Sequence, residues 1–254
     1  MPPRNAQRDL EAEHRPAAIR DRLSHPKGES ALGDAVLGGV DGVITTFAVV
    51  AGGAGGGLPA TVIIVLGIAN LIADGFSMAV GNYLGTRSRQ QEIARIRKDE
   101  AWQIDVYPEG ERREIREIFA RKGFEGETLD RVVDVITADR QIWTDTMLQE
   151  ELKLSEVSNR PWRAAIATFT AFVAIGFAPL FPFVVPVLPA DDRFAASAAL
   201  AGAAFVGLGV WKGAVLQTSP LRSGGQTLAL GAGAAALAYA AGTVLGRIFG
   251  VSAG

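Results

Sequence analysis

Residues Pro59–Gly85 read PATVIIVLGIANLIADGFSMAVGNYLG, an apolar stretch long enough to cross a bilayer as one helix. Within it, Asn70, Asp74 and Met78 follow one another at intervals of four residues. At about 100° per residue each interval turns only about 40°, so the three side chains share one helix face. An ionisable group at membrane depth costs roughly 2.5–3.5 kcal/mol and usually faces protein or a wet path. We therefore expect Asp74 to belong to a functional site; the alternative is that it lies at headgroup depth, near the arginines that follow, and is solvated.

The rest of the chain repeats this apolar character in separate segments. Of its 254 residues 48% are hydrophobic, and each apolar segment has about the 20 residues that a membrane-spanning helix needs. The segments are 34–57, 59–85, 164–188, 194–216 and 227–249. We predict an all-α integral membrane protein with five transmembrane helices and a cytoplasmic helical insert between the second and the third. The expected parts are a tail (1–32), helices 1 and 2 (33–85), the insert (86–163) and helices 3–5 (164–254).

The charged residues predict the orientation of these helices. The first thirty residues are polar and carry several arginines, and they lack the apolar centre of a cleavable signal peptide. Arginines also follow the second apolar segment. Because basic residues favour the cytoplasmic side, we expect a cytoplasmic N-terminus and insert and an outside C-terminus. The lack of an organellar targeting segment and the high alanine and arginine usage favour the plasma membrane of a prokaryote.

Several classes of site are excluded by composition. The chain has no cysteine, which excludes disulfides, thiolate metal sites and thiol nucleophiles. Both histidines, His14 and His25, lie in the polar tail, so no helix-borne histidine metal motif is present in the body. The sequence also contains no P-loop and no Gly-x-Ser-x-Gly elbow. We expect a protein that is not an enzyme.

A second polar stripe is predicted on the first membrane helix. Asp34, Gly38, Asp41 and Thr45 follow at spacings of four, three and four, which place them on one face. A candidate transport path therefore draws on both helices. Its residues are Asp41, Met78, Asp74, Asn70, Asp34 and Thr45.

Pairs of glycines four residues apart predict close helix packing. Gly38 and Gly42 form one pair on the first helix, and Gly81 and Gly85 form another on the second. The simplest arrangement joins these two faces, either within the chain or across a dimer axis.

The insert is rich in acidic side chains, most of which we expect to form a solvated, ion-paired surface. Two groups differ from the rest: Glu111 and Glu114 at i, i+3, and Met147 and Glu151 at i, i+4. Carboxylates bind divalent cations, and a thioether adds a preference for softer transition ions. The spacing therefore indicates a metal site. We expect helices over 109–122, after Gly126 and over 140–157.

Two motifs and the position of the insert resemble the vacuolar iron transporter family. The motifs are DGVITTFAVVAG on the first helix and ADGFSMAVGNYLG on the second, and the resemblance extends from Asp34 to Phe249. It implies a homodimer in a lipid bilayer, with no nucleic-acid partner, that moves Fe²⁺ and related divalent ions such as Mn²⁺, Co²⁺ or Zn²⁺ out of the cytosol in exchange for protons.

The resemblance also implies roles for individual residues. Asp41 and Met78 would line the ion path between two subunits. The insert would bind metal through Glu100, Glu111, Glu114, Met147 and Glu151, with the adjacent Glu150 as a further candidate. The chain departs from the family pattern in three places: Asn70 and Gln103 stand where glutamates are expected, and Leu148 where a second methionine can occur. Asp74, one turn after Asn70, is an acid that can substitute for the first of these glutamates.

Two other functions stay open at this point. In one, the insert is a membrane-anchored ferroxidase whose carboxylates oxidise iron, although no histidine accompanies them. In the other, the protein is a passive divalent-metal channel and the insert is its sensor.

Overall fold

The computed structural model describes residues 12–24, 32–154, 160–185 and 188–249, and every regular element in these ranges is helical. Residues 1–31 form a separate unit, whose described part contains α2 (Pro16–Ser24). The other elements are α3 (Leu32–Gly55), α4 (Ala60–Val106), α5 (Pro108–Arg121), α6 (Gly126–Thr137), α7 (Arg140–Glu150), α8 (Pro161–Gly176), α9 (Phe181–Val184), the 3-10 turn η1 (Ala190–Asp192), α10 (Arg193–Val215) and α11 (Pro220–Phe249).

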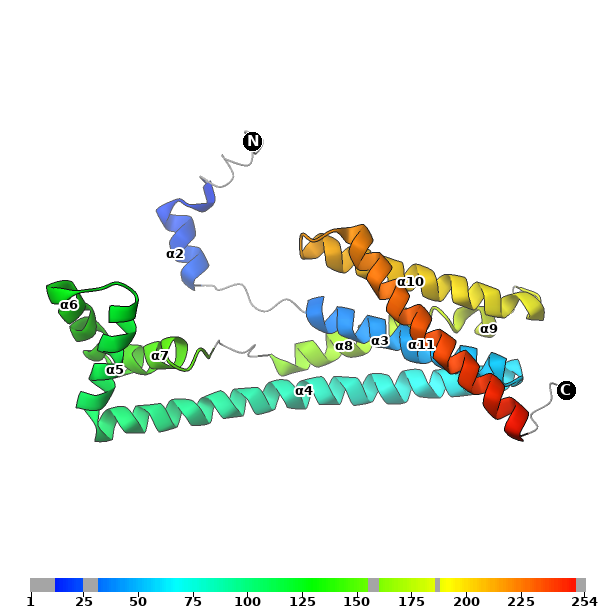
Figure 1. Ribbon diagram of the computed structural model, residues 1–254, viewed down its shortest axis with the longest axis horizontal. Helices are drawn as coiled ribbons and strands as arrows, with labels where there is room; N and C mark the ends of the chain where they lie inside the picture. Colours follow the sequence, from blue (N-terminus) through cyan, green and yellow to red (C-terminus); the bar gives the residue numbers. More distant parts are fainter. Residues whose placement is uncertain (1–11, 25–31, 155–159, 186–187, 250–254) are drawn as a thin grey trace. The chain divides into compact units, whose positions relative to one another are not determined.

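Helix α4 is a single unbroken helix of 47 residues that joins the apolar part of the chain to the insert (Figure 1). Its first half packs against α3 and α8, and its second half packs against α5 and α7. The sequence between Thr86 and Val106 is charged but contains neither proline nor glycine, so nothing interrupts the helix. The predicted continuation of this helix beyond the apolar segment is confirmed. It ends at Val106, and its C-cap residue Tyr107 directly precedes Pro108.

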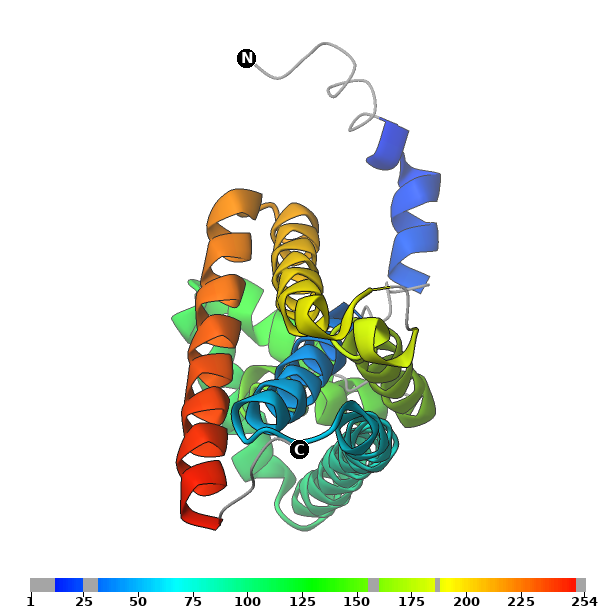
Figure 2. The same ribbon diagram turned by 90° about the vertical axis from the view of Figure 1, so that its right-hand side faces the viewer.

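Helix α3 is the central element of the apolar part. It packs against α4, α8, α10 and α11, and Figure 2 shows it surrounded by these helices. Its buried side chains Val43, Phe47 and Val50 meet Phe172 of α8 and Phe205 of α10 in one hydrophobic cluster. Because α3 is enclosed on most sides, residues on its polar stripe lie inside the protein or face α4.

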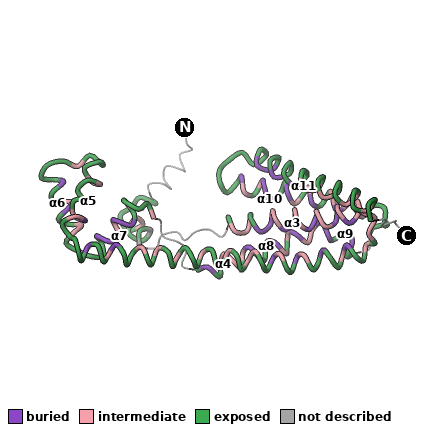
Figure 3. Tube along the Cα trace, turned by 60° about the horizontal axis from the view of Figure 1, so that its bottom comes forward, coloured by how far each residue is buried: buried purple, intermediate pink, exposed green. Residues whose placement is uncertain are grey.

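Helices α4 and α11 keep most of their apolar surface exposed (Figure 3). In their most apolar windows, 22% of the α4 residues and 11% of the α11 residues are buried. An apolar surface of this extent needs lipid or another protein to cover it.

Four helices in the described part of the chain are long and apolar enough to cross a membrane: α3, α4, α10 with the preceding turn, and α11. The chain is a multi-pass membrane protein. The predicted third span does not appear as one helix, because α8 has 16 residues and ends before a turn that contains Pro179. Proline lacks the N–H that would continue the helix. This third span, for which α8 and α9 would have to cross the membrane together, stays a prediction.

Two predicted boundaries are wrong. The last insert helix ends at Glu150 rather than near residue 157, and Lys153 has a positive φ of 53°, which is incompatible with a continuing helix. Helix α11 begins at Pro220, before the predicted start of its apolar segment. Proline suits the first helical position, so much of the predicted loop is the first turns of α11.

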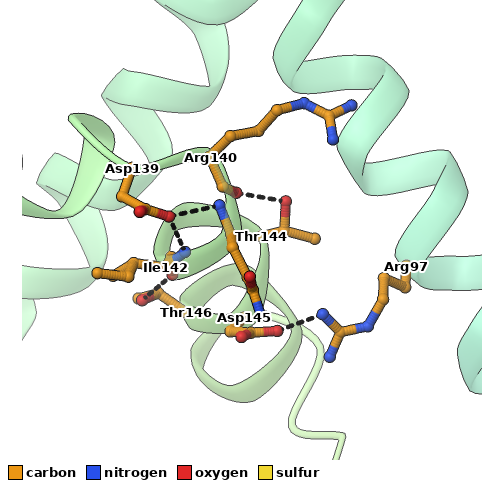
Figure 4. Close-up of polar contacts among 8 residues, drawn as sticks. Arg97, Asp139, Arg140, Ile142, Thr144, Asp145 and Thr146 are labelled. Atoms are coloured by element: carbon orange, nitrogen blue, oxygen red, sulfur yellow. Dashed lines mark hydrogen bonds and ion pairs between the residues drawn. The ribbon is translucent and has the colours of Figure 1, made fainter.

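The insert has its own hydrophobic core, and a polar contact also connects it to the second half of α4. Ile104 of α4 meets Ile115, Val133 and Met147 from α5, α6 and α7. At the start of α7, the Asp139 carboxylate accepts hydrogen bonds from the backbone N–H groups of Gln141 and Ile142 at 2.8 and 3.0 Å (Figure 4). In the same view Arg97 of α4 donates to Asp145 of α7, which ties the two helices together.

Candidate functional site

A groove of about 480 Å³ lies between α3 and α4 in the apolar part of the protein, and it is open on one side. Most of its lining is apolar, including Val49 and Leu66, but Asn70 and Asp74 contribute polar side chains. Asn70 Nδ2 is buried and has no hydrogen-bond partner among the described residues. A buried amide donor without a partner costs free energy and is satisfied by a hydrogen-bond acceptor such as water, so the groove is suited to a polar, hydrated occupant.

The structure brings two acids from different helices near each other, and one of them, Asp74, lines the groove. Asp41 of α3 and Asp74 of α4 are both half-buried, and they lie close enough for their negative charges to interact. Asp74 stands about 20 Å before Arg87 along α4, at a rise of about 1.5 Å per residue, which separates it from the basic end of the helix. Two carboxylates facing each other repel unless a proton or a cation lies between them.

Met78 and Thr45 each lie one helical turn after one of these acids. Met78 is half-buried one turn after Asp74 and packs against the central hydrophobic cluster. Thr45 Oγ1 donates to the backbone oxygen of Asp41 at 3.0 Å, so its hydroxyl hydrogen is used within α3. The thioether of Met78 is a soft ligand beside hard carboxylates, a combination suited to divalent transition metals.

Asp34, which the sequence placed on the same path, has a hydrogen-bond partner that sequence analysis missed. Asn82 Nδ2 donates to Asp34 Oδ1 at 2.7 Å and to Thr168 Oγ1 at 2.8 Å. One amide thus joins α3, α4 and α8. Asn82 lies four residues after Met78, so extending the predicted stripe by one turn would have included it.

The two glycine pairs have different surroundings. A Cβ on Gly38 would lie 2.3 Å from the carbonyl oxygen of Thr168, and one on Gly42 would lie 2.4 Å from that of Phe172. The close partner of this pair is therefore α8, and the predicted packing onto the Gly81 and Gly85 face within one chain is wrong. A Cβ on either of those two glycines of α4 would meet no atom of another described residue within 4 Å.

A second cluster lies in the insert, where Glu100 of α4 meets Glu111 of α5. Both residues are buried, 4% and 6% exposed. Burial, followed by the charge of Glu111 and a hydrogen bond shared with it, raises the pKa of Glu100 to about 8. Burial and the charge of Glu114 raise the pKa of Glu111. Glu100 Oε1 and Glu111 Oε2 are buried without a partner among the described residues, as expected of acceptors that a cation would satisfy.

The remaining predicted insert ligands lie at different distances from this pair. Glu114 and Glu151 are more exposed but act electrostatically on Glu100. Partial desolvation and then the charges of Glu114 and Glu111 raise the pKa of Glu151. Met147 is fully buried in the insert core, and Gln103 is exposed. Within the described ranges no three acidic or histidine side chains are close enough to hold an ion without rearranging.

Glu150 has a different environment from these ligands. Its carboxylate forms ion pairs with Lys122 and, at 3.5 Å, with Lys153. The hydrogen bond from Lys122 is the main reason that its pKa lies below the ordinary value. The structure therefore gives Glu150 a role in tying α7 to the end of α5, and it does not bring this residue to the Glu100 pair.

The raised pKa of Glu100 predicts a pH-dependent stability. Glu100 holds its proton in the folded protein up to about pH 8, whereas the ordinary value is 4.5. Between these values unfolding releases a proton, so the free energy of unfolding should fall as the pH rises from about 4.5 to 8. Glu100→Gln, which mimics the protonated form, should raise the melting temperature at pH 8 by at least about 2–4 °C.

Thermal melts at pH 5, 6.5 and 8 in a metal-chelating buffer test this. Glu109→Gln on α5 is the matched control, because that side chain is exposed and its substitution should leave the pH slope unchanged. Equal pH slopes for the wild type and Glu100→Gln would contradict the assignment.

Comparison with known proteins gives a consistent result. Residues 32–243 match the model of the VIT family. The chain is 34% identical over 209 residues to Vacuolar iron transporter 1 of Arabidopsis thaliana, covering 81% of this chain and 82% of the relative. It is 30% identical over 226 residues to the Vacuolar iron transporter of Toxoplasma gondii, covering 85% and 75%. The resemblance read from the two membrane motifs is confirmed, and the chain belongs to the VIT family.

Proposed function

We propose that this protein exports Fe²⁺ and related divalent transition metals, Mn²⁺ among them, from the cytosol in exchange for protons. Relatives named vacuolar iron transporters support metal transport. The observation that carries the proposal is the approach of Asp41 and Asp74, from two apolar helices, with Asp74 lining a groove that is open on one side. Neither acid has a cationic partner among the described residues, so a cation from outside is the natural counter-charge.

Exchange with protons follows from the chemistry of such a pair. A carboxyl group in a poorly hydrated site holds a proton until a cation displaces it. Metal and protons therefore compete for the same oxygens of Asp41 and Asp74. Met78 supplies a soft ligand that favours Fe²⁺ over Mg²⁺ or Ca²⁺ at this point. Asn70 keeps a carbonyl oxygen where the family pattern has an acid, and Asp74 supplies the missing charge.

A homodimer completes this path in the proposal. The groove is open on one side, and the exposed face of α4 carries Gly81 and Gly85 with free space above them. Small residues allow helix backbones to approach closely in a membrane. A second copy on this face closes the groove and covers apolar surface of α4.

The insert serves as a cytoplasmic metal collector. Four carboxyl groups that influence one another, Glu100, Glu111, Glu114 and Glu151, raise the local concentration of cations. When a metal binds, it displaces the proton held by Glu100 and satisfies the two unpartnered oxygens. In this proposal the protein lies in a plasma membrane with its N-terminus inside and its C-terminus outside, so transport removes excess metal from the cytosol.

Purified protein in liposomes tests the transport function. We expect Fe²⁺ and Mn²⁺ added outside to quench a metal-sensitive dye inside liposomes that contain the protein, and not in empty ones. Oxygen consumption is recorded in the same samples. The amount of Fe³⁺ formed is measured afterwards with a chelator that binds ferric iron.

Each outcome of this assay separates two functions. Metal uptake without oxygen consumption supports a transporter. Oxygen consumption that accompanies Fe²⁺ addition, with no uptake of Mn²⁺, would replace transport by the ferroxidase alternative. No uptake and no oxidation would contradict both.

A further inference from the structure

A second cavity, of about 420 Å³, lies at the connection between α10 and α11 and shares no lining residue with the groove. Two cations line it: Lys212 from the last turn of α10 and Arg222 from the first turn of α11. Among the described residues no acid lines the cavity, and neither cation forms an ion pair. A concave site with two uncompensated cations attracts an anion.

The start of α11 adds hydrogen-bond donors to this cavity. The helix begins at Pro220, and the first N–H groups of a helix have no partner within it. Ser219 caps the helix weakly, accepting from the Arg222 N–H at 3.5 Å. The partial positive charge at this helix end has the same sign as the two side chains.

Ser223 supplies an independent indication of a ligand. It lines the cavity and is only 6% exposed, yet its Oγ has no hydrogen-bond partner among the described residues. A buried hydroxyl without a partner is costly, and a ligand oxygen would satisfy it. Gly213 brings α10 close enough to hold Ser223 in place, because a Cβ there would lie 2.7 Å from Pro220 Cα and 3.2 Å from Ser223 Cβ.

We propose that this cavity binds a phosphate group, with Arg222 and Lys212 neutralising its charge and the Ser223 hydroxyl donating to one of its oxygens. Leu216 also lines the cavity, and Trp211 and Leu221, the sequence neighbours of its two cations, are exposed. Apolar side chains around a basic pocket at a helix end suit the headgroup and first acyl carbons of an anionic phospholipid. The connection lies at the same end of the bundle as the start of α3, the end that basic residues assign to the cytoplasm (Figure 1).

The test uses the full chain, purified in a neutral detergent and stripped of lipid. Binding of phosphatidylglycerol, phosphatidylcholine and inorganic phosphate is measured by native mass spectrometry and by the shift in melting temperature. The variants are Arg222→Gln, Lys212→Gln and Ser223→Ala. Arg247→Gln, near the other end of α11, is the matched control.

We expect phosphatidylglycerol to bind the wild type more tightly than phosphatidylcholine. Loss of either cation should weaken its binding by about tenfold. Ser223→Ala should weaken lipid binding without lowering the melting temperature of the lipid-free protein, because the hydroxyl has no partner among the described residues. Arg247→Gln should bind as the wild type does.

The same binding measurements show whether the phosphate group belongs to a lipid or to a soluble ion. Phosphatidylglycerol binding that millimolar inorganic phosphate does not displace supports the proposal with a lipid as ligand. Stabilisation by inorganic phosphate that requires Arg222 supports it with a soluble ligand. If Arg222→Gln and Lys212→Gln bind phosphatidylglycerol and inorganic phosphate as tightly as Arg247→Gln does, the proposal is wrong.

Discussion

Liposomes that contain the Asp41→Asn protein are expected to take up no Fe²⁺ or Mn²⁺ above the background of empty liposomes. Two unit charges 4 Å apart interact by about 4 kcal/mol at an effective dielectric constant of about 20. An amide in place of the Asp41 carboxylate removes an interaction of this size with the ion, equivalent to about a thousandfold in affinity. The Asp41 side chain makes no hydrogen bond to a described residue, so the variant should fold normally.

The control for this experiment is Asp191→Asn, which removes an exposed acid in the turn η1. It should transport as the wild type does. Circular dichroism and size-exclusion profiles establish that both variants are folded. Normal metal uptake by Asp41→Asn would remove this residue from the path and with it the main support for the proposed site.

The second large effect is expected for Gly42→Ala, which should lower the stability of the whole apolar bundle. Its new Cβ would lie 2.4 Å from the Phe172 carbonyl oxygen. That oxygen belongs to the α8 backbone and cannot move away as a side-chain end can, so α3 and α8 must separate. Overpacking of this kind costs about 1–3 kcal/mol, although alanine alone favours a helix over glycine by about 1 kcal/mol.

This effect is measured by thermal unfolding in detergent. The readout is the loss of the monodisperse size-exclusion peak as the temperature rises. Gly233→Ala on α11 is the matched control, because a Cβ there would meet no other described residue within 4 Å. It should melt at or slightly above the wild-type temperature. A Gly42→Ala protein that melts with the control would show that the two backbones are not in close contact.

Much of this architecture can be predicted from local sequence patterns, because residues close together in the chain determine it. The length of α4 is predictable because a charged helical sequence without proline or glycine follows an apolar one. The stripe of Asn70, Asp74 and Met78 needs only the helical repeat. Glu111 and Glu114 of the insert share a face for the same reason, and their binding of a metal stays a prediction.

Features that depend on contacts between distant segments could not be predicted in this way. Glycine spacing indicates that Gly38 and Gly42 approach another helix, but it does not identify α8 as that helix. The bond from Asn82 to Asp34 and Thr168 joins three separate parts of the sequence. The ion pairs of Glu150 also need a lysine from another helix. Such partners are selected by tertiary packing, which no local pattern contains.

Exchange of metal for protons can be recorded directly in liposomes. Wild-type protein is placed in liposomes that contain both a metal-sensitive and a pH-sensitive dye, and Fe²⁺ or Mn²⁺ is added outside. We expect the interior to become more alkaline as metal enters, and we expect an acidic interior to accelerate the entry of metal. Metal entry with no change in internal pH, at a rate that the pH gradient does not affect, would contradict exchange with protons and identify a passive channel.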